Sequence, residues 1–399
     1  MPKVFSLVCA ALFFLMLVGN GAAIEIDDQV FIPTMGVDRV EGGLQLTVHM
    51  PRGAATGESG DPASEYTVVM AQARGFSTCL DVLRIGLPRK VNYMQLMLIV
   101  FSEEVARDEG FFALIEEMIN SQQIGPHATV SVSQCKASEI IENLQPQVGM
   151  SLTRSLEGAL KSLESTTYAD RQQLMMLYHE MVGETRDATT ILSDIQQPVH
   201  LGELIAKERQ PGDILPGQLP VEHQYRVVRM GAALINDQRM VDTLTGYEVQ
   251  LMGMLKGDVT DSLIFLSPEG MPTLTTYVRQ SAPSKVVIDM AKGSIQVELF
   301  LSFYTLLDRS MTPEEHAGYA ACAEAMMHEH LSQLIDKLQH SGVDPVGFAG
   351  YAVRGFPTVQ RWQEYQWKER WPGMAVDIIV SAHMRDPGDG PGSQPYTAH

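Results

Sequence analysis

The residues in this sequence that are best suited to metal chemistry are histidines on one predicted helix. His328 and His330 flank Glu329, but residues two positions apart point about 200° away from each other around an α-helix, so their imidazoles cannot hold one ion. A zinc-protease helix would need its histidines four residues apart. His316, His328 and His340 recur every 12 residues, which places neighbours roughly 18 Å apart along the axis. The pattern therefore predicts a solvated helix surface and no metal site.

No other motif gathers the residues that nucleophilic or phosphate chemistry requires. The sequence has no GxSxG, no P-loop and no GxGxxG ahead of a predicted helix, although an active site assembled from distant residues would leave no such motif. The 4 cysteines are widely spaced without a CxxC pair, which argues against a zinc knuckle and favours buried free thiols over a disulfide framework. We predict a protein that is not an enzyme and has no metal or cofactor.

The composition is that of a globular protein with an acidic surface. Of 399 residues, 45% are hydrophobic and 19% are charged, and 48 acidic side chains against 29 basic ones give a net charge of -19. A surface of this sign repels phosphate backbones and anionic headgroups, which argues against a nucleic-acid partner. Acidity also promotes solubility, and this simpler interpretation is favoured over a role in collecting cations. The length allows two or three domains.

The first 23 residues have the three parts of a signal peptide in the correct order. Lys3 supplies positive charge, residues 4–18 form an uncharged apolar run, and residues 21–23 (Gly-Ala-Ala) are small enough for cleavage. The apolar run is shorter than the roughly 20 residues that a membrane-spanning helix needs. We therefore expect residues 1–23 to be a signal peptide and the protein to be exported.

The signal resembles that of a bacterial lipoprotein in which the lipid-bearing residue has been replaced. Leu17, Val18 and Gly19 match the residues before the lipidated cysteine, but Asn20 stands at the cysteine position. Asparagine has no thiol to carry a diacylglyceryl group, so lipid attachment is not expected. Either the signal is cut after Ala23, or it stays as a weak N-terminal anchor, or the coding sequence was altered at this position.

Strands and helices alternate through residues 24–200, which predicts an N-terminal α/β domain. Apolar runs and turn residues predict strands at 29–34, 44–50, 66–72, 95–101 and 129–133, with turns at 36–38 and 41–43. Helical spacing of apolar residues predicts helices at 77–87, 111–120 and 137–143 and a helical stretch over 151–182. The segment that follows loses this periodicity and gathers prolines, so residues 201–222 are expected to be a linker.

Two further domains are expected after the linker. Strands at 225–235, 240–243 and 263–266 and a helix at 246–255 predict a small middle domain over 223–270. Strands at 285–290, 294–304 and 376–381 and one long helix predict a C-terminal α/β domain over 271–386. That helix begins with Thr312 as N-cap, Pro313 at its first position and Glu315 in a capping box, and its apolar face extends to about Gln339. Residues 387–399 are rich in Gly and Pro and are expected to be a flexible tail.

Several segments, in order along the chain, resemble the Ger(x)C family, the C subunits of the nutrient receptors of spore germination. Residues 24–28 through Gly36-Val37-Asp38 are similar to the family's opening strand and turn, without its Cys-Trp pair. Residues 75–83 and 95–106 resemble the family's first helix and the strand after it. Residues 231–235, 240–242 and 251–255, the last containing Gly253, resemble its central unit.

The C-terminal part carries the most specific resemblance. Residues 344–349, Asp-Pro-Val-Gly-Phe-Ala, resemble the family's Asp-x-Phe-Gly-Phe-Gly box, three tryptophans follow, and residues 376–380 are similar to the closing strand. Gly347 and Gly350 are expected to permit close backbone approach, and the tryptophans are expected to form a packing anchor. The family residues to which we assign structural roles are Gly253, Asp344, Gly347, Phe348 and Trp371.

The resemblance covers residues 24–388 and implies the fold, the role and the location of the protein. It implies an α/β (α+β) fold of three mixed-sheet domains with packed helices and no enzymatic activity. It also implies a place on the outer face of the spore inner membrane, beside an integral-membrane A subunit and a transporter-like B subunit. Direct binding of a small-molecule germinant is left open, without support from the residues. The alternative hypothesis is an exported solute-binding or hydrolytic envelope protein, which would need a deep pocket with convergent polar groups.

Overall fold

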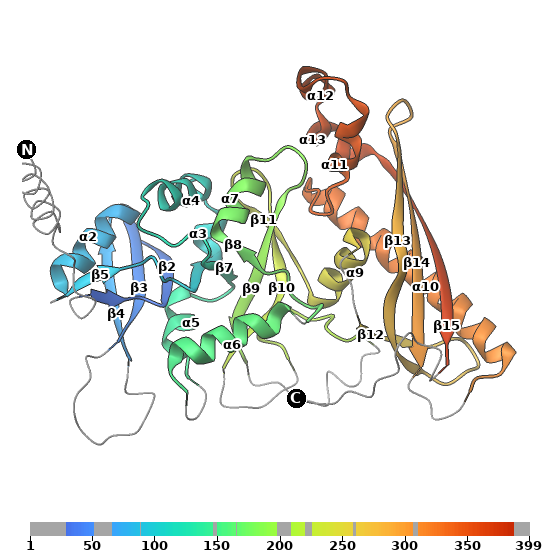
Figure 1. The fold of residues 1–399 in the computed structure, drawn as a ribbon, viewed down its shortest axis with the longest axis horizontal. Coiled ribbons are helices and arrows are strands. Elements are labelled where there is room, and N and C mark those ends of the chain that lie inside the picture. The colour runs from blue at the N-terminus through green and yellow to red at the C-terminus, as the bar shows by residue number, and fades with distance from the viewer. Residues whose placement is uncertain are drawn as a thin grey trace, which may run out of the picture.

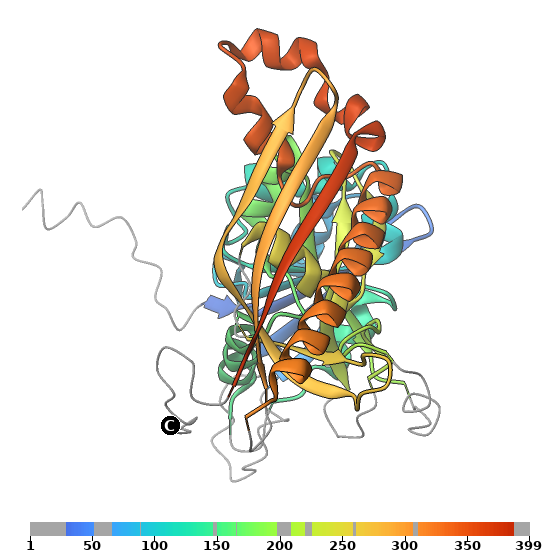
Figure 2. The same cartoon turned by 90° about the vertical axis from the view of Figure 1, so that its right-hand side faces the viewer.

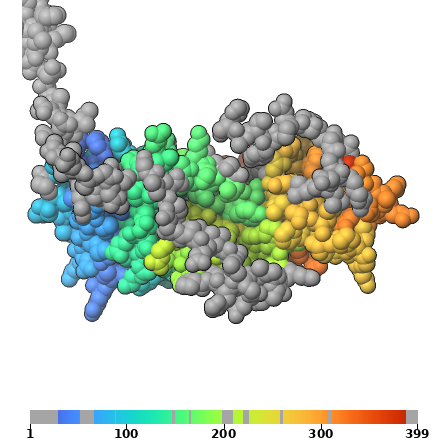
Figure 3. All heavy atoms as spheres, turned by 90° about the horizontal axis from the view of Figure 1, so that it is seen from below, coloured from blue at the N-terminus to red at the C-terminus, as the bar shows by residue number. Residues whose placement is uncertain are grey.

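The computed structural model describes residues 29–51, 66–87, 89–146, 150–164, 166–197, 209–219, 226–257, 261–305 and 310–386. They form an elongated molecule whose elements follow chain order along the long axis (Figures 1 and 3). Three sheets and the helices packed on them make up two lobes, so the predicted α/β (α+β) class is confirmed. The predicted signal peptide, Asn20 and the predicted tail lie outside the described residues.

The first lobe, residues 29–244, is built on a nine-stranded sheet with the order β11-β10-β9-β7-β6-β2-β3-β4, in which β8 also pairs with β7. The neighbouring strands β9, β7, β6 and β2 run parallel to one another. β1 (Gln29–Phe31) and β5 (Lys90–Asn92) form a separate parallel pair. The strands of the large sheet are β2 (Thr34–Val40), β3 (Gly43–Pro51), β4 (Tyr66–Ala73), β6 (Leu98–Ser102), β7 (Thr129–Ser133), β8 (Gln172–Gln173), β9 (Ala188–Ile195), β10 (Val227–Ile235) and β11 (Met240–Leu244).

Helices cover both faces of this sheet. Leu80 of α2 (Phe76–Gly86), Ile115 of α4 (Phe111–Asn120) and Leu177 of α7 (Leu174–Val182) belong to the core on one face. Ile141 of α5 (Ala137–Asn143) and Leu156 of α6 (Leu152–Glu164) belong to the core on the other. The short α3 (Glu103–Arg107) follows β6 directly. Every residue of β6 and β7 is buried, as parallel strands are when helices cover both faces.

The second lobe, residues 246–386, is built on a four-stranded sheet of order β12-β13-β14-β15. The helix α10 (Pro313–Ser341) lies along this sheet (Figure 2) and buries Met327, Leu331 and Leu338 on its inner face. Its predicted start is confirmed, because Thr312 and Glu315 form the capping box. The other elements are β12 (Ser262–Leu266), β13 (Leu274–Asp289), β14 (Ser294–Thr305), β15 (Ala375–Arg385), α11 (Phe348–Ala352), α12 (Val359–Tyr365), α13 (Trp367–Arg370) and the single turns η3 (Val353–Gly355) and η4 (Trp371–Gly373).

A shared core joins the two lobes through α9 (Gly246–Lys256). One hydrophobic cluster contains Leu234 of β10, Leu244 of β11, Met254 of α9 and Leu299 of β14. β10 and β11 extend the first sheet, whereas β12 begins the second. The segment 223–270, which we expected to be a small middle domain, therefore has no sheet of its own within the described residues and instead divides its elements between the lobes.

Residues 36–38 lie inside β2, so the predicted turn at this point is wrong, and the chain turns only at residues 41–42. Glycine is needed here for a different reason. A Cβ atom on Gly36 would lie 2.9 Å from Cγ1 of Ile141 and 3.1 Å from the carbonyl oxygen of Ala137. The glycine therefore lets α5 pack directly against β2, a contact that its sequence neighbours do not indicate.

Other differences from the prediction concern the chain after residue 150. The helical stretch expected over 151–182 is two helices, α6 and α7, with β8 between them, and the short helices after residue 347 were not predicted. β9 was missed because Thr189, Thr190 and Ser193 interrupt its apolar pattern, although all three are buried. The described part of the expected linker, residues 209–219, packs on the protein: the N–H of Tyr247 donates to the carbonyl of Gly212 at 2.8 Å.

Candidate functional site

Asp344 organises the turn that connects α10 to α11. Its side chain is buried, with 2% of its surface exposed. One carboxylate oxygen accepts hydrogen bonds from the backbone N–H groups of Gly347 and Phe348 at 2.8 and 3.0 Å, and the other accepts from Ala349 at 2.8 Å. Burial raises the pKa of Asp344 to about 6 even though these three hydrogen bonds act to lower it. Asp344 therefore fixes the backbone with which the family box begins.

Asp187 ties this turn to the first lobe. The N–H of Asp344 donates to the Asp187 carboxylate at 2.7 Å, and the N–H of Asp187 donates to the carbonyl of Asp344 at 3.0 Å. Lys368 of α13 forms ion pairs with Asp187, at 3.3 Å, and with Asp237 in the β10–β11 turn. The two lobes are thus joined by a reciprocal pair of buried hydrogen bonds and a bridging cation. We call Asp187, Asp344 and Lys368 the junction clamp.

The glycines of the box lie against the same segment of the first lobe. Gly347 has a φ of +85°, in the left-handed region that favours glycine. A Cβ atom there would lie 3.4 Å from Cδ of Arg186, and a Cβ on Gly350 would lie 3.6 Å from the carbonyl oxygen of Thr185. Both glycines therefore lie against residues 185–186, shortly before β9. The sequence alone does not indicate this contact.

The tryptophans pack beside the clamp as a continuous aromatic cluster. The ring centroids of Trp362 and Trp367 are 6.0 Å apart, those of Trp367 and Trp371 are 6.2 Å apart, and Phe348 lies 5.5 Å from Trp371. All four side chains are buried. The indole N–H of Trp371 donates to the carbonyl of Val343 at 2.8 Å, which ties the cluster to the residue before Asp344. Aromatic burial of this size is a large contribution to local stability.

Gly253 is not part of this junction. It lies in α9, where its carbonyl accepts a hydrogen bond from the N–H of Gly257 at the end of the helix. Close by, Lys256 forms an ion pair with Asp170 of the first lobe at 2.9 Å. The structure therefore brings Asp344, Gly347, Phe348 and Trp371 together and places Gly253 in a second contact region between the lobes.

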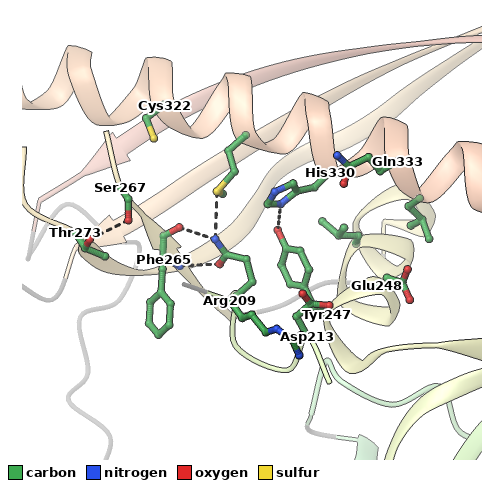
Figure 4. A pocket seen from close by; sticks show the side chains of 14 residues that line it. Arg209, Asp213, Tyr247, Glu248, Phe265, Ser267, Thr273, Cys322, His330 and Gln333 are labelled. Atoms are coloured by element: carbon green, nitrogen blue, oxygen red, sulfur yellow. Dashed lines mark hydrogen bonds between the residues drawn. The ribbon is translucent and has the colours of Figure 1, made fainter. Parts of the chain in front are cut away.

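A cleft of about 590 Å³ opens between residues 209–213, α9, β12 and α10 (Figure 4). The side-chain amide of Gln210 pairs with the backbone of Phe265 at the edge of β12, through hydrogen bonds of 2.9 and 3.0 Å. The hydroxyl of Tyr247 and Nδ1 of His330 are 2.8 Å apart. Burial raises the pKa of Tyr247 and lowers that of His330, so both are neutral at neutral pH. The side chains of Gln210, Tyr247 and His330 therefore each have a hydrogen-bond partner within the protein.

The histidines of α10 point to separate partners. Nδ1 of His328 is 2.8 Å from the carbonyl oxygen of Ile378, and Nε2 of His316 is 3.2 Å from the carboxylate of Asp386. His330 instead faces the cleft. Across the described ranges, no three histidine, cysteine or acidic side chains are placed to hold a metal ion.

Three polar residues with defined roles escaped the sequence reasoning. Asp187 and Lys368 complete the junction clamp, and Asp38 accepts hydrogen bonds from the N–H groups of Ala137 and Ser138 at 2.7 and 2.8 Å, which caps α5. In the sequence, Asp38 stands out only as the last residue of the Gly36-Val37-Asp38 motif. Each partner lies about a hundred or more positions away along the chain, so no local pattern signals the contact.

The fold is that of the spore germination proteins. Residues 22–194 match the family described as "Spore germination protein N-terminal domain", and residues 230–388 match "Spore germination B3/ GerAC like, C-terminal". The chain belongs to the Ger(x)C family of germinant-receptor C subunits, and the resemblance inferred from its motifs is confirmed. Its role therefore lies in spore germination.

Relatives of known name span nearly the whole chain. Spore germination protein KC of Bacillus subtilis (strain 168) is 19% identical over 385 residues, 91% of each chain. Putative spore germination protein YfkR of the same strain is 20% identical over 390 residues, 94% of each. The crystal structure of the GerBC protein matches with a TM-score of 0.51 at 13% identity, over 88% of this chain and 96% of that one. In the part of this chain that the structure describes, no helix is both long and apolar enough to cross a membrane.

Proposed function

We propose that the protein is a non-enzymatic subunit of a spore germinant receptor that acts through protein–protein contacts at the membrane. The observation that carries this proposal is the match to both family domains, over residues 22–194 and 230–388. The partners are the integral-membrane A and B subunits that the family implies, and the location is the outer face of the spore inner membrane. The shared core and the junction clamp support this role, because they join the lobes into one body that can hold two partners at a set distance.

The cleft chemistry supports a role without catalysis. A general base must reach the proton that it removes, and a nucleophile needs such a base beside it. Here the Tyr247 hydroxyl and His330 are occupied with each other, and the Gln210 amide is used by the backbone of β12. These pairs stabilise the walls of the cleft between segments 209–213, α9 and α10.

A deletion strain that lacks paralogues of this subunit tests the proposal. We expect its spores to lose the response to the nutrient of the cognate receptor, and a wild-type copy to restore the response. A copy carrying Asp344→Ala should restore less, and its protein level and co-purification with the A subunit show whether assembly is the step lost. Asp336→Ala, on the exposed face of α10, is the matched control. Normal germination of the deletion strain would refute the role.

The expected absence of a lipid anchor is tested separately. Asn20 has no thiol, so mass spectrometry of the membrane fraction should find an N-terminus without a diacylglyceryl group. A free N-terminus at Ile24 indicates cleavage, and an N-terminus at Met1 indicates a retained signal. The variant Asn20→Cys should gain the mass of the lipid. A lipid mass on the wild-type chain would contradict this part of the proposal.

The cleft favours solute binding as a second candidate function. Its volume of about 590 Å³ falls within the roughly 300–1,000 Å³ typical of small-molecule sites. A nutrient that binds the native state should raise the melting temperature with concentration, and His330→Phe should abolish the rise. Screening amino acids and sugars against the purified protein without finding such a rise would exclude this function.

A further inference from the structure

One edge of the large sheet is β4, and this strand has none of the features that usually protect an edge. β4 ends the strand order of the sheet, and among the described residues no strand pairs with its outer side. Its sequence, YTVVMAQA, contains no charged residue, no proline and no glycine, and its pairing with β3 is regular throughout. Natural edge strands commonly carry a charge, a proline or a bulge that blocks further pairing. The edge of β4 is therefore a template for another strand.

The register of the β2–β3 hairpin shows which backbone groups of β4 point outward. Val40 and Gly43 close its two-residue turn, and the closing pair of such a hairpin is hydrogen-bonded. Because the hydrogen bonds alternate between the two sides of a strand, Leu44 and every second residue after it bond to β4. Their partners on β4 are Ala73, Ala71, Val69 and Thr67. The N–H and C=O groups that point away from β3 therefore belong to Tyr66, Val68, Met70 and Gln72.

An uncharged flank of α2 faces the same edge. The helix follows β4 after residues 74–75 and packs on β4 and β3, so it runs back along the strand. Its side toward α4 is marked by Ser77 and Arg84, which donate hydrogen bonds to α4 and to the turn after it. Val82 lies about 140–160° around the helix from these two residues, and 41% of its surface is exposed. Thr78, Val82 and Gly86, each four positions apart, thus line the flank that faces away from α4.

The edge also lacks the charge that the rest of the chain carries. β4 and α2 lie at one end of the elongated molecule (Figure 1). β3 and β4 contain no acidic residue and no lysine or arginine, and burial lowers the pKa of His49 in β3 to about 4, so this histidine is neutral. Asp81 and Arg84 of α2 pair with each other at 3.4 Å. Because the whole chain has a net charge of -19, two copies repel each other least where they meet through an uncharged edge.

We propose that two copies of this chain pair through β4 in antiparallel orientation, which joins their large sheets across a two-fold axis at Val69. The residues whose backbone groups point to the partner must oppose one another in such a pair. With Val69 opposite its own copy, every outward residue finds its partner inside the strand. The pairs are then Tyr66 with Gln72 and Val68 with Met70. An axis at Met70 would place the partner of Tyr66 beyond the end of β4, so the strand is self-complementary about Val69.

The helices add to the same contact. From Ala73 back to Val69 the strand covers roughly 13 Å, and α2 covers roughly 9 Å from Phe76 to Val82, so Val82 lies near the level of the axis. The side chain of Val69 packs against the core on the face that α2 covers. The two copies of α2 would then lie antiparallel on one face of the joined sheet and cover the two Val69 side chains. This dimer is independent of the contacts proposed with the A and B subunits.

Sedimentation equilibrium of the full-length purified protein tests the proposal. We expect a reversible monomer–dimer equilibrium over roughly 1–100 µM, the range of weak dissociation constants. Met70→Lys places a charge on the edge and should raise the dissociation constant about tenfold or more. Met176→Lys on α7 is the matched control, because 45% of Met176 and 46% of Met70 are exposed, and it should dimerise as the wild type does. Val82→Glu tests the α2 flank and should also weaken the dimer, even if Met70→Lys does not fold.

Cysteine crosslinking tests the register. In Val69→Cys, each new thiol would lie in a non-hydrogen-bonded pair with its own copy, where Cα atoms are about 4.5 Å apart. This separation suits a disulfide, so mild oxidation should link most of the dimer. Val68→Cys is the control, because Val68 faces Met70 and not its own copy. It should crosslink no more than the wild-type chain, whose own cysteines set the background.

The possible contrary results are distinct. A folded wild-type protein that stays monomeric at the highest concentration would overturn the proposal. Dimers of Met70→Lys and Val82→Glu as tight as the wild type would show that another surface forms the contact. Equal crosslinking through Val68→Cys and Val69→Cys would exclude the two-fold register at Val69.

Discussion

Replacing Asp344 by asparagine separates the charge of the junction clamp from its shape. Asparagine has the same size, but its amide can accept through one atom only, whereas both oxygens of Asp344 accept backbone hydrogen bonds. The N–H of Ala349 would then face an NH₂ group and lose its partner. A buried donor left without a partner costs about 1–3 kcal/mol. We expect Asp344→Asn to lower the free energy of unfolding of the second lobe by about this amount.

The pH dependence gives the same substitution a sharper signature. The difference between a pKa of 3.8 and one of about 6 corresponds to roughly 3 kcal/mol. The folded-state pKa is the higher one, so the folded protein binds this proton more tightly than the unfolded chain does. The stabilisation from protonation is complete below pH 3.8 and is lost as the pH rises through about 6. Lowering the pH from about 8 to about 5 should therefore raise the free energy of unfolding of the wild type by roughly 1–2 kcal/mol. Asp344→Asn should lack this gain.

Tryptophan fluorescence measures this locally, because the 3 tryptophans of the chain all lie in the cluster beside Asp344. Urea unfolding followed by fluorescence at about pH 5 and about pH 8 therefore reports on the second lobe. Asp336→Asn, on the exposed face of α10, is the control and should retain the wild-type pH dependence. If Asp344→Asn gained as much stability on acidification as the wild type, the assignment of the proton to Asp344 would be refuted.

Three further substitutions test the core and the lobe contacts. Burial lowers the pKa of His49 to about 4. The unfolded chain therefore binds this proton more tightly, and the protein should lose roughly 3 kcal/mol of stability in full as the pH falls from 6.5 to about 4. His49→Gln should lessen this loss, measured as the change in melting temperature between about pH 7 and about pH 5. Burial alone would raise the pKa of Asp170, but Lys256, Thr189 and Arg186 together outweigh it and the pKa is lowered. Lys256→Met should therefore cost about 3 kcal/mol in urea unfolding, and no cost would mean that solvent screens the pair. Trp371→Phe removes the hydrogen bond to Val343 and should cost roughly 1–2 kcal/mol by circular dichroism; an unchanged midpoint would contradict that role.

The sequence by itself determined the elements whose signals are local. The capping box at Thr312 and Glu315 defined the start of α10, because a cap involves residues only three positions apart. The predictions for β7 at 129–133 and α5 at 137–143 match the structure residue for residue, since their apolar spacing has one clear period. The order of the motifs identified the family, because each motif is short and continuous in the chain.

Only the tertiary structure decided which distant residues meet. Asp187 and Asp344 are separated by 157 positions, and nothing near either residue indicates the other. β9 lacks an apolar pattern because it buries hydroxyl side chains such as Ser193, which hydrogen-bonds to Ser131 of the neighbouring β7 inside the sheet. Arg229 lies beside a register shift in β10, and two of its guanidinium nitrogens are sealed from solvent, which no local pattern of the sequence indicates. Local chemistry specifies helices and strands, whereas the junction clamp depends on the path of the whole chain.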